Sequence, residues 1–131
     1  MNILIFGGAG FVGRHYTEHF LRKGEVVNIV DNIAPLSGGV HPKKWKIFNP
    51  YKFKKKFNFI NQDCRNFFNN KLKRKYNLVI NLAAIVGGRE VIENNPLAVA
   101  EDLEIDTAFW RWVVKNKKKI GHVITYSSSA A

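Results

Sequence analysis

Five short, mostly apolar runs recur along the chain and predict five strands. The first, Asn2–Phe6, reads N-I-L-I-F. A continuous apolar run of this length is typical of a strand that is buried on both faces of a parallel sheet. The other runs lie at residues 26–30, 57–60, 78–82 and 122–126. Strands of this kind need helices on both faces of the sheet to cover them.

Segments with a helical spacing of apolar residues alternate with these strands. Residues 11–21 form the first, and Lys23-Gly24 gives it a basic last turn and a stop signal. Residues 97–114 form the second, and Pro96 suits its first turn. This alternation predicts an α/β fold, a Rossmann-type doubly wound parallel sheet with helices on both faces.

Two stretches lack a clear periodic pattern. Residues 32–50 are interrupted too often by proline and glycine for regular structure, so they predict a long excursion. Residues 65–74 are polar and basic and predict a helix or a turn. Because the chain shows neither a linker nor an internal repeat, its 131 residues predict a single domain.

A glycine-rich turn joins the first strand to the first helix. It reads Gly7-Gly8-Ala9-Gly10-Phe11-Val12-Gly13. In such a turn the first glycine permits a sharp exit from the strand, the second lets a pyrophosphate approach the backbone, and the third lets helix and strand pack closely. The helix start at Phe11 and Val12 then offers free N–H groups and the positive end of the helix dipole to an anion. The motif predicts dinucleotide binding.

Asp31 stands at the end of the second strand, eighteen residues after Gly13. This spacing suits a carboxylate that accepts hydrogen bonds from the adenosine ribose hydroxyls. A carboxylate there repels a 2′-phosphate, and no arginine follows it closely, so NAD is favoured over NADP. The alternative is a solvent-facing aspartate at a strand end, with no role in binding.

The glycine spacing G-x-x-G-x-x-G resembles that of the extended short-chain dehydrogenase/reductases, the NAD-dependent nucleotide-sugar epimerases and dehydratases. Three further stretches resemble this family in the same order. They are Asp63-Cys64-Arg65 after the third strand, Asn81-Leu82-Ala83-Ala84 after the fourth, and Tyr126-Ser127-Ser128-Ser129-Ala130 at the fifth. Residues 85–89 further resemble the branch that acts on GDP-sugars, although a Gly-Gly turn also has a purely structural interpretation.

The resemblance implies roles for individual residues. Asp63 would recognise the adenine, Cys64 would cover it, and the small residues after the fourth strand would let the backbone lie against the cofactor. Ser129 would be the catalytic hydroxyl, which hydrogen-bonds the sugar oxygen at the carbon that exchanges the hydride. The implied NAD-binding residues are Gly7, Gly10, Phe11, Val12, Gly13, Asp31, Asn32, Asp63, Cys64, Leu82, Ala83 and Ala84. The implied substrate is a UDP-, GDP- or dTDP-linked sugar, and a homodimer is a further expectation.

The chain also departs from the family pattern. The family's general acid/base is a tyrosine with a lysine four positions on, located after the serine strand, and this chain ends at Ala131. Tyr51 and Lys55 match that spacing but precede the third strand, so we reject them as catalytic. Asp102 falls where many relatives carry an asparagine. We therefore expect residues 1–131 to be an NAD-binding Rossmann domain truncated after about the fifth strand, with little or no turnover alone.

Composition narrows the remaining alternatives. The single cysteine, Cys64, is not grouped with the histidines at metal-ligand spacings, so no metal is expected. No apolar run is long enough to cross a bilayer and no signal peptide is evident, so the expected location is cytoplasmic. The net charge of +11 comes largely from lysine clusters at 52–56, 71–75 and 115–119. Solvated loops explain these first, and attraction of an anion, either nucleic acid or a phosphorylated small molecule, ranks second. No nucleic-acid-binding motif accompanies the clusters, so nucleic acid is not an expected partner. The rival function is a non-catalytic NAD-binding module or a basic nucleic-acid-associated protein.

Overall fold

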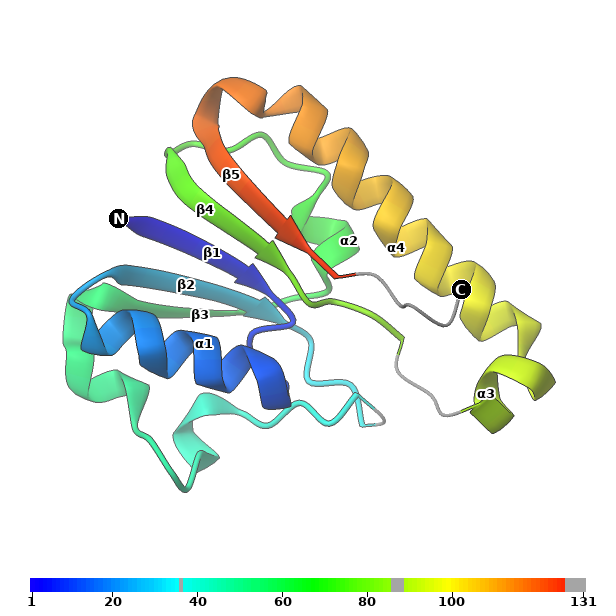
Figure 1. Ribbon diagram of the computed structural model, residues 1–131, viewed down its shortest axis with the longest axis horizontal. Coiled ribbons are helices and arrows are strands. Elements are labelled where there is room, and N and C mark those ends of the chain that lie inside the picture. Colours follow the sequence, from blue (N-terminus) through cyan, green and yellow to red (C-terminus); the bar gives the residue numbers. More distant parts are fainter. Residues whose placement is uncertain (36, 86–88, 127–131) are drawn as a thin grey trace.

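The computed structural model describes residues 1–35, 37–85 and 89–126 of the chain. Its centre is one five-stranded sheet, drawn in Figure 1, with the order β3-β2-β1-β4-β5 and with every pairing parallel. The strands are β1 (Asn2–Phe6), β2 (Val26–Asp31), β3 (Phe57–Asn61), β4 (Tyr76–Asn81) and β5 (Ile120–Thr125). The predicted doubly wound parallel sheet is confirmed.

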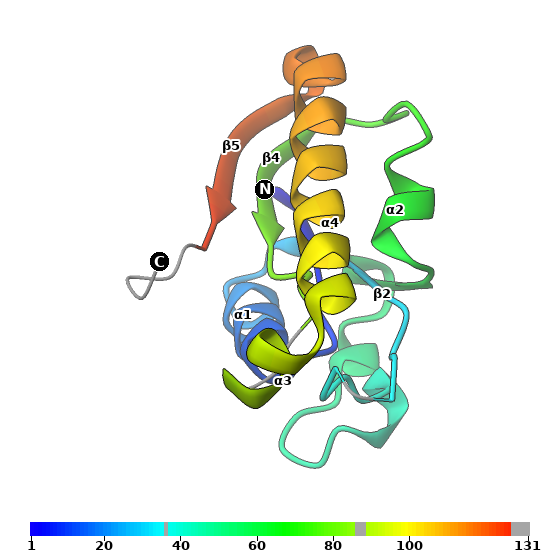
Figure 2. The ribbon, with the colours of Figure 1, turned by 90° about the vertical axis from the view of Figure 1, so that its right-hand side faces the viewer.

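Helices cover both faces of this sheet. Helix α1 (Phe11–Arg22) lies on one face, and α2 (Cys64–Phe67) and α4 (Pro96–Lys115) lie on the other, as Figures 1 and 2 show together. A short helix, α3 (Arg89–Asn94), precedes α4. Three 3-10 helices complete the elements of the described residues: η1 (Pro42–Lys44), η2 (Pro50–Lys56) and η3 (Lys117–Lys119).

Alternate residues of the central strand β1 supply two cores, because successive side chains of a strand point to opposite faces. Ile3 and Ile5 are fully buried on the α1 face, whereas Leu4 and Phe6 are fully buried on the face of α2 and α4. The Phe6 ring packs edge-on against Phe68, at 4.8 Å between ring centroids, and against Trp112 of α4. The apolar run in β1 therefore holds both helix layers.

The stretches without a periodic pattern contain more structure than the sequence indicates. Trp45 is buried within the 32–50 excursion, and its indole N–H donates to the Val40 carbonyl at 2.8 Å. The Val40 N–H in turn donates to the Ala9 carbonyl at 3.1 Å, which brings the excursion against the glycine-rich turn. In the 65–74 stretch the helix stops at Phe67. The Leu72 N–H then donates to Asn116 Oδ1 just after α4, which ties the rest of the stretch to that helix end.

Candidate functional site

A cavity of about 780 Å³ opens at the carboxyl end of the sheet. The chain leaves β1 toward α1 on one face and leaves β4 toward α3 and α4 on the other. Because the connections from these two neighbouring strands diverge, a crevice forms beyond their ends. This is the topological switch point at which open α/β sheets bind their ligands.

The structure brings all of the sequence-predicted cofactor residues together at this cavity. Its lining includes Gly7, Gly10, Phe11, Val12, Gly13, Asp31, Asn32, Asp63, Cys64, Leu82, Ala83 and Ala84. They come from four separate connections, each following a different strand. Ser129 and residues 86–88 lie outside the described residues, so their predicted roles stay predictions.

The glycines of the turn divide into two kinds. A Cβ on Gly13 would lie 2.6 Å from the Gly7 carbonyl oxygen, and Gly7 itself has φ +73° and approaches the Leu82 backbone. These two positions are therefore required by the packing of the turn. A Cβ on Gly10 would meet one protein atom within 4 Å, the Gly7 carbonyl oxygen at 3.3 Å. Gly10 therefore leaves space at the cavity wall that a larger side chain would fill.

Helix α1 begins at this wall without a capping side chain. Gly10 is its N-cap residue, and the first turn contains no acidic residue. The first N–H groups of a helix have no partner within the helix, and they carry the positive end of its dipole. Phe11 and Val12 are 69% and 48% exposed beside the cavity. The arrangement can bind an anion by its backbone N–H groups alone.

Asp31 is buried at the end of β2, so it is not a solvent-facing strand end. Its Oδ2 accepts from the Ala9 N–H at 3.0 Å, and its Oδ1 accepts from the Ile33 N–H at 2.8 Å. The carboxylate thus fastens the glycine-rich turn to the start of the excursion. Two oxygens offer about four acceptor positions, so capacity remains for hydroxyl donors in the cavity.

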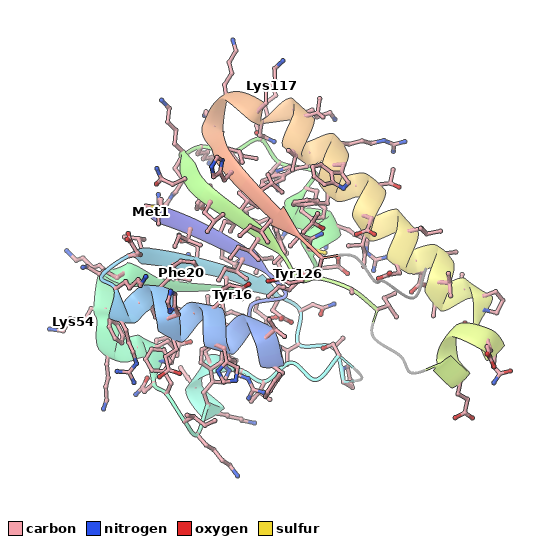
Figure 3. The ribbon with its side chains drawn as sticks, viewed as in Figure 1. Met1, Tyr16, Phe20, Lys54, Lys117 and Tyr126 are labelled. Atoms are coloured by element: carbon pink, nitrogen blue, oxygen red, sulfur yellow. The ribbon has the colours of Figure 1, made fainter. Side chains whose placement is uncertain are left out.

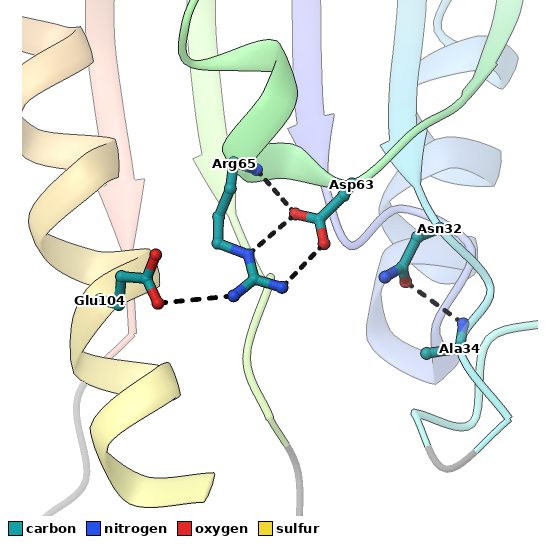
Figure 4. Close-up of polar contacts among 5 residues, drawn as sticks. All are labelled: Asn32, Ala34, Asp63, Arg65 and Glu104. Atoms are coloured by element: carbon teal, nitrogen blue, oxygen red, sulfur yellow. Dashed lines mark hydrogen bonds and ion pairs between the residues drawn. The ribbon is translucent and has the colours of Figure 1, made fainter. Parts of the chain in front are cut away.

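Asp63 and Arg65 form a bidentate ion pair at another side of the cavity, shown in Figure 4. Arg65 Nε lies 3.1 Å from Asp63 Oδ1, and Arg65 Nη2 lies 2.9 Å from Oδ2. The same carboxylate caps α2 by accepting from the Arg65 N–H at 2.9 Å. Arg65 also approaches Glu104 of α4 at 3.5 Å. The hydrogen bond from Arg65 holds the pKa of Asp63 below its usual range.

The sequence pointed to Asp102 alone of the acidic face that α4 presents to this cavity, and Glu101 and Asp106 were missed. Glu101, Asp102 and Asp106 all belong to the lining. Asp102 Oδ1 accepts from the Ile85 N–H at 2.9 Å and so connects α4 to the segment after β4. Burial, followed by repulsion from Asp102, raises the pKa of Asp106 above its usual range. The four-residue spacing of the two aspartates on a predicted helix is the signal that could have revealed this face.

Tyr126, the last described residue before the predicted catalytic serine, also lines the cavity. Its hydroxyl contacts the hydroxyl of Tyr16 on α1, and Figure 3 shows the two side chains meeting at the end of the sheet. This hydrogen bond raises the pKa of Tyr126. The end of β5 is thereby connected to the helix that begins at the glycine-rich turn.

These features define the class of protein. A glycine-rich turn leads into an uncapped helix, a carboxylate ends the next strand, and the cavity lies at the switch point of a parallel sheet. Together they are typical of dinucleotide-binding α/β domains. The family follows from the sequence: residues 3–131 match the model of the NAD dependent epimerase/dehydratase family, and the chain belongs to that family. NAD is the cofactor that this family uses.

Solved structures of nucleotide-sugar enzymes share the fold. The UDP-Glc/GlcNAc 4-epimerase of Campylobacter jejuni superposes with a TM-score of 0.77 at 24% identity, over 98% of this chain and 37% of that one. The UDP-glucose-4-epimerase of Stenotrophomonas maltophila, solved with NAD and formylated UDP-arabinopyranose, superposes with a TM-score of 0.76 at 18% identity. The match covers 99% of this chain and 38% of that one.

A dTDP-glucose 4,6-dehydratase from Streptomyces venezuelae, with NAD bound, gives a TM-score of 0.72 at 18% identity, over 94% of this chain and 38% of that one. The chain therefore spans well under half the length of the solved structures that it matches. No curated protein sequence matches it.

Within the described ranges, no helix is long and apolar enough to cross a membrane. The same residues contain no group of three or more His, Cys, Asp or Glu side chains placed to hold a metal ion.

Proposed function

We propose that this chain binds NAD in the cavity at the carboxyl end of the sheet and serves as the cofactor-binding part of a nucleotide-sugar epimerase or dehydratase. The observation that carries this proposal is the convergence of residues from four connections on one cavity, beside a glycine position that is open to it. Family membership supports the reaction class, and the fold neighbours include enzymes acting on UDP- and dTDP-linked sugars.

The described residues fit a dinucleotide. The N–H groups of Phe11 and Val12 would hold the pyrophosphate, with Gly10 leaving room for it. Asp31 would accept hydrogen bonds from the adenosine ribose. The Asp63–Arg65 pair would form one side of the region that holds the adenine. The carboxylate of Asp31 would also repel a 2′-phosphate, which favours NAD over NADP.

The chemistry that NAD supplies in such a site is reversible removal of a hydride from a sugar carbon. Ser129 would hydrogen-bond the sugar oxygen at that carbon, as the family resemblance implies. In a longer polypeptide that supplies Tyr-x-x-x-Lys after the serines, Ser129→Ala should lower the chemical rate by roughly one to three orders of magnitude and leave NAD affinity nearly unchanged. Ser127→Ala should do much less. The isolated 131-residue chain should show little or no turnover.

Calorimetric titration with NAD tests the proposal, and Gly10→Val is the decisive variant. The added side chain should fill the cavity wall and weaken NAD binding at least about tenfold, because the pyrophosphate loses its close approach to the backbone. The melting temperature should change little, since the Gly10 backbone has φ −71°, which any residue adopts. Unchanged NAD affinity in a folded Gly10→Val protein would contradict the site.

The second candidate function is an NAD-binding module without catalysis. It predicts the same NAD affinity in the titration, so only the activity of the longer polypeptide distinguishes the two functions. There it predicts no turnover of any UDP-, GDP- or dTDP-linked sugar even when Tyr-x-x-x-Lys is present. The lysine clusters are the observation that keeps a non-catalytic role open, and they lead to a separate inference.

A further inference from the structure

All three lysine clusters lie at one edge of the sheet, opposite the cavity. The cluster at 52–56 comes immediately before β3, that at 71–75 before β4, and that at 115–119 before β5. Because every strand is parallel, the amino ends of all five strands share one edge. Figure 3 shows Lys54, Met1 and Lys117 along this edge. The sheet thus collects charges that are far apart in sequence.

We call this region the amino-edge surface, and its members are exposed apart from the half-buried Lys119. They are Lys23, Lys52, Lys54, Lys55, Lys56, Lys71, Lys73, Arg74, Lys75, Lys115, Lys117, Lys118 and Lys119. Two hydrogen bonds fasten the clusters to their neighbours. Lys119 Nζ donates to the Leu72 carbonyl at 2.7 Å, and Lys56 Nζ donates to the Gly24 carbonyl at 2.9 Å. These two bonds hold the Lys119 and Lys56 side chains against the backbone of neighbouring segments.

The amino-edge surface lacks compensating carboxylates. Among the described residues, the cations that form ion pairs are the Met1 amino group, Arg22 and Arg65, and none belongs to this surface. The two acidic residues nearest to it, Glu18 and Glu25, are already paired with Arg22 and the Met1 amino group. The other carboxylates lie toward the opposite end: Asp31, Asp63, Glu90, Glu93, Glu101, Asp102, Glu104 and Asp106. The chain is therefore strongly polarised along its strands.

We propose that the amino-edge surface binds the phosphate backbone of nucleic acid, independently of base sequence. The five strands span about 19 Å at a spacing of about 4.8 Å, which corresponds to about five or six phosphates of one duplex strand. The cations of the amino-edge surface follow the line of the sheet edge, and the phosphates of a nucleic-acid strand also follow a line. A bilayer, in contrast, presents its charges in a plane. Lysine acts as a flexible point charge that suits backbone contacts more than bidentate reading of bases. The opposite edge stays free for NAD.

Fluorescence anisotropy with a labelled DNA duplex of about 20 base pairs tests this proposal. With about six phosphate contacts, the logarithm of the affinity should fall with the logarithm of the salt concentration at a slope of about −5. The affinity should then drop about a thousandfold between about 50 and 200 mM salt. Polyglutamate and phosphatidylserine vesicles serve as competing polyanions in the same assay.

The variants localise the effect. Lys73→Gln, Lys117→Gln and Lys118→Gln combined should reduce the steepness of the slope by two to three and weaken duplex binding at least about tenfold. The matched control changes Lys43, Lys44 and Lys46 to Gln, which removes the same charge from exposed positions on and beside η1. Its duplex affinity should change less than about twofold, and neither triple variant should change NAD affinity.

Three outcomes would overturn the proposal. They are no duplex binding at low salt, equal losses in the two triple variants, and tighter binding to polyglutamate or to the vesicles than to the duplex. NAD titration of the same samples reports on the carboxyl-end site separately, so failure at one edge leaves the other assignment intact.

Discussion

The two ends of the same sheet hold their charges in opposite ways. At the carboxyl end, Asp31, Asp63 and Asp102 each accept a backbone N–H, so their positions are fixed by the fold. At the amino end most lysines extend into solvent, and ion pairs with them are absent from the described part of the chain. The contrast separates a preorganised pocket, which can discriminate between ligands by geometry, from a charged edge that acts through its field.

We expect the largest effect from a substitution in the glycine-rich turn, and the quantity that changes is the free energy of unfolding. Gly13→Ala places a Cβ 2.6 Å from the Gly7 carbonyl oxygen and from Gly8 Cα, and backbone atoms cannot move aside cheaply. Urea denaturation should show a loss of about 3 kcal/mol in unfolding free energy, as for overpacking in a core. Gly10→Ala is the control and should lose less than about 1 kcal/mol. Equal losses of unfolding free energy would contradict the conclusion that the packing of the turn requires Gly13 but not Gly10.

Asp31 should give the next largest effect, because it joins two regions of the pocket. Asp31→Asn keeps the shape but presents an amide NH₂ to one of two N–H donors, so about 1 to 3 kcal/mol of stability should be lost. The charge that opposes a 2′-phosphate also disappears. Dissociation constants for NAD and NADP should show a clear preference for NAD in the original chain and a narrower gap in the variant.

A matched control for Asp31 is Asn49→Ala, which lies outside the cavity lining. Asn49 is exposed and accepts from the Tyr51 N–H at 3.1 Å, so its loss should cost less than about 1 kcal/mol. It should leave the ratio of NAD to NADP affinity almost unchanged. Tighter binding of NADP than NAD by the original chain would contradict the role given to Asp31.

The sequence predicts which residues meet at the carboxyl end, because their determinants are local. Glycine spacing, a strand end and the small residues after β4 each carry their own constraint, and parallel pairing then brings them to one edge. The sequence indicated Asp63-Cys64-Arg65 as a motif, but it did not predict the ion pair between Asp63 and Arg65. The contact of Arg65 with Glu104 was not predicted either, because it depends on how α4 packs on the sheet. The gathering of the lysines was missed for the same reason, since each cluster alone resembles an ordinary loop.

The Asp63–Arg65 pair should make stability depend on acid. Its low folded pKa means that Asp63 contributes stability above the ordinary carboxyl range, and that this contribution is lost as pH falls through the folded pKa. In Arg65→Gln the melting temperature should therefore fall less steeply as the pH decreases below about 4. Arg22→Gln removes an exposed ion pair with Glu18 on α1 and should leave that acid dependence in place. An unchanged acid profile in Arg65→Gln would contradict this assignment.

Substitution of Asp106 should have the smallest effect on stability, and it should raise the unfolding free energy, whereas the substitutions above lower it. Its pKa is raised by burial and by Asp102, so the folded chain favours the protonated form and loses stability as pH rises through the ordinary and the folded pKa. Asp106→Asn should raise the unfolding free energy at pH 7 by less than about 0.5 kcal/mol, because solvent screens this exposed carboxylate. The gain should vanish below the ordinary range of aspartate pKa values. Glu101→Gln removes the same charge from the same helix and leaves the aspartate pair intact, so it should give no such gain. A gain from Glu101→Gln equal to that from Asp106→Asn would point to the overall charge of the helix instead of the Asp102–Asp106 pair.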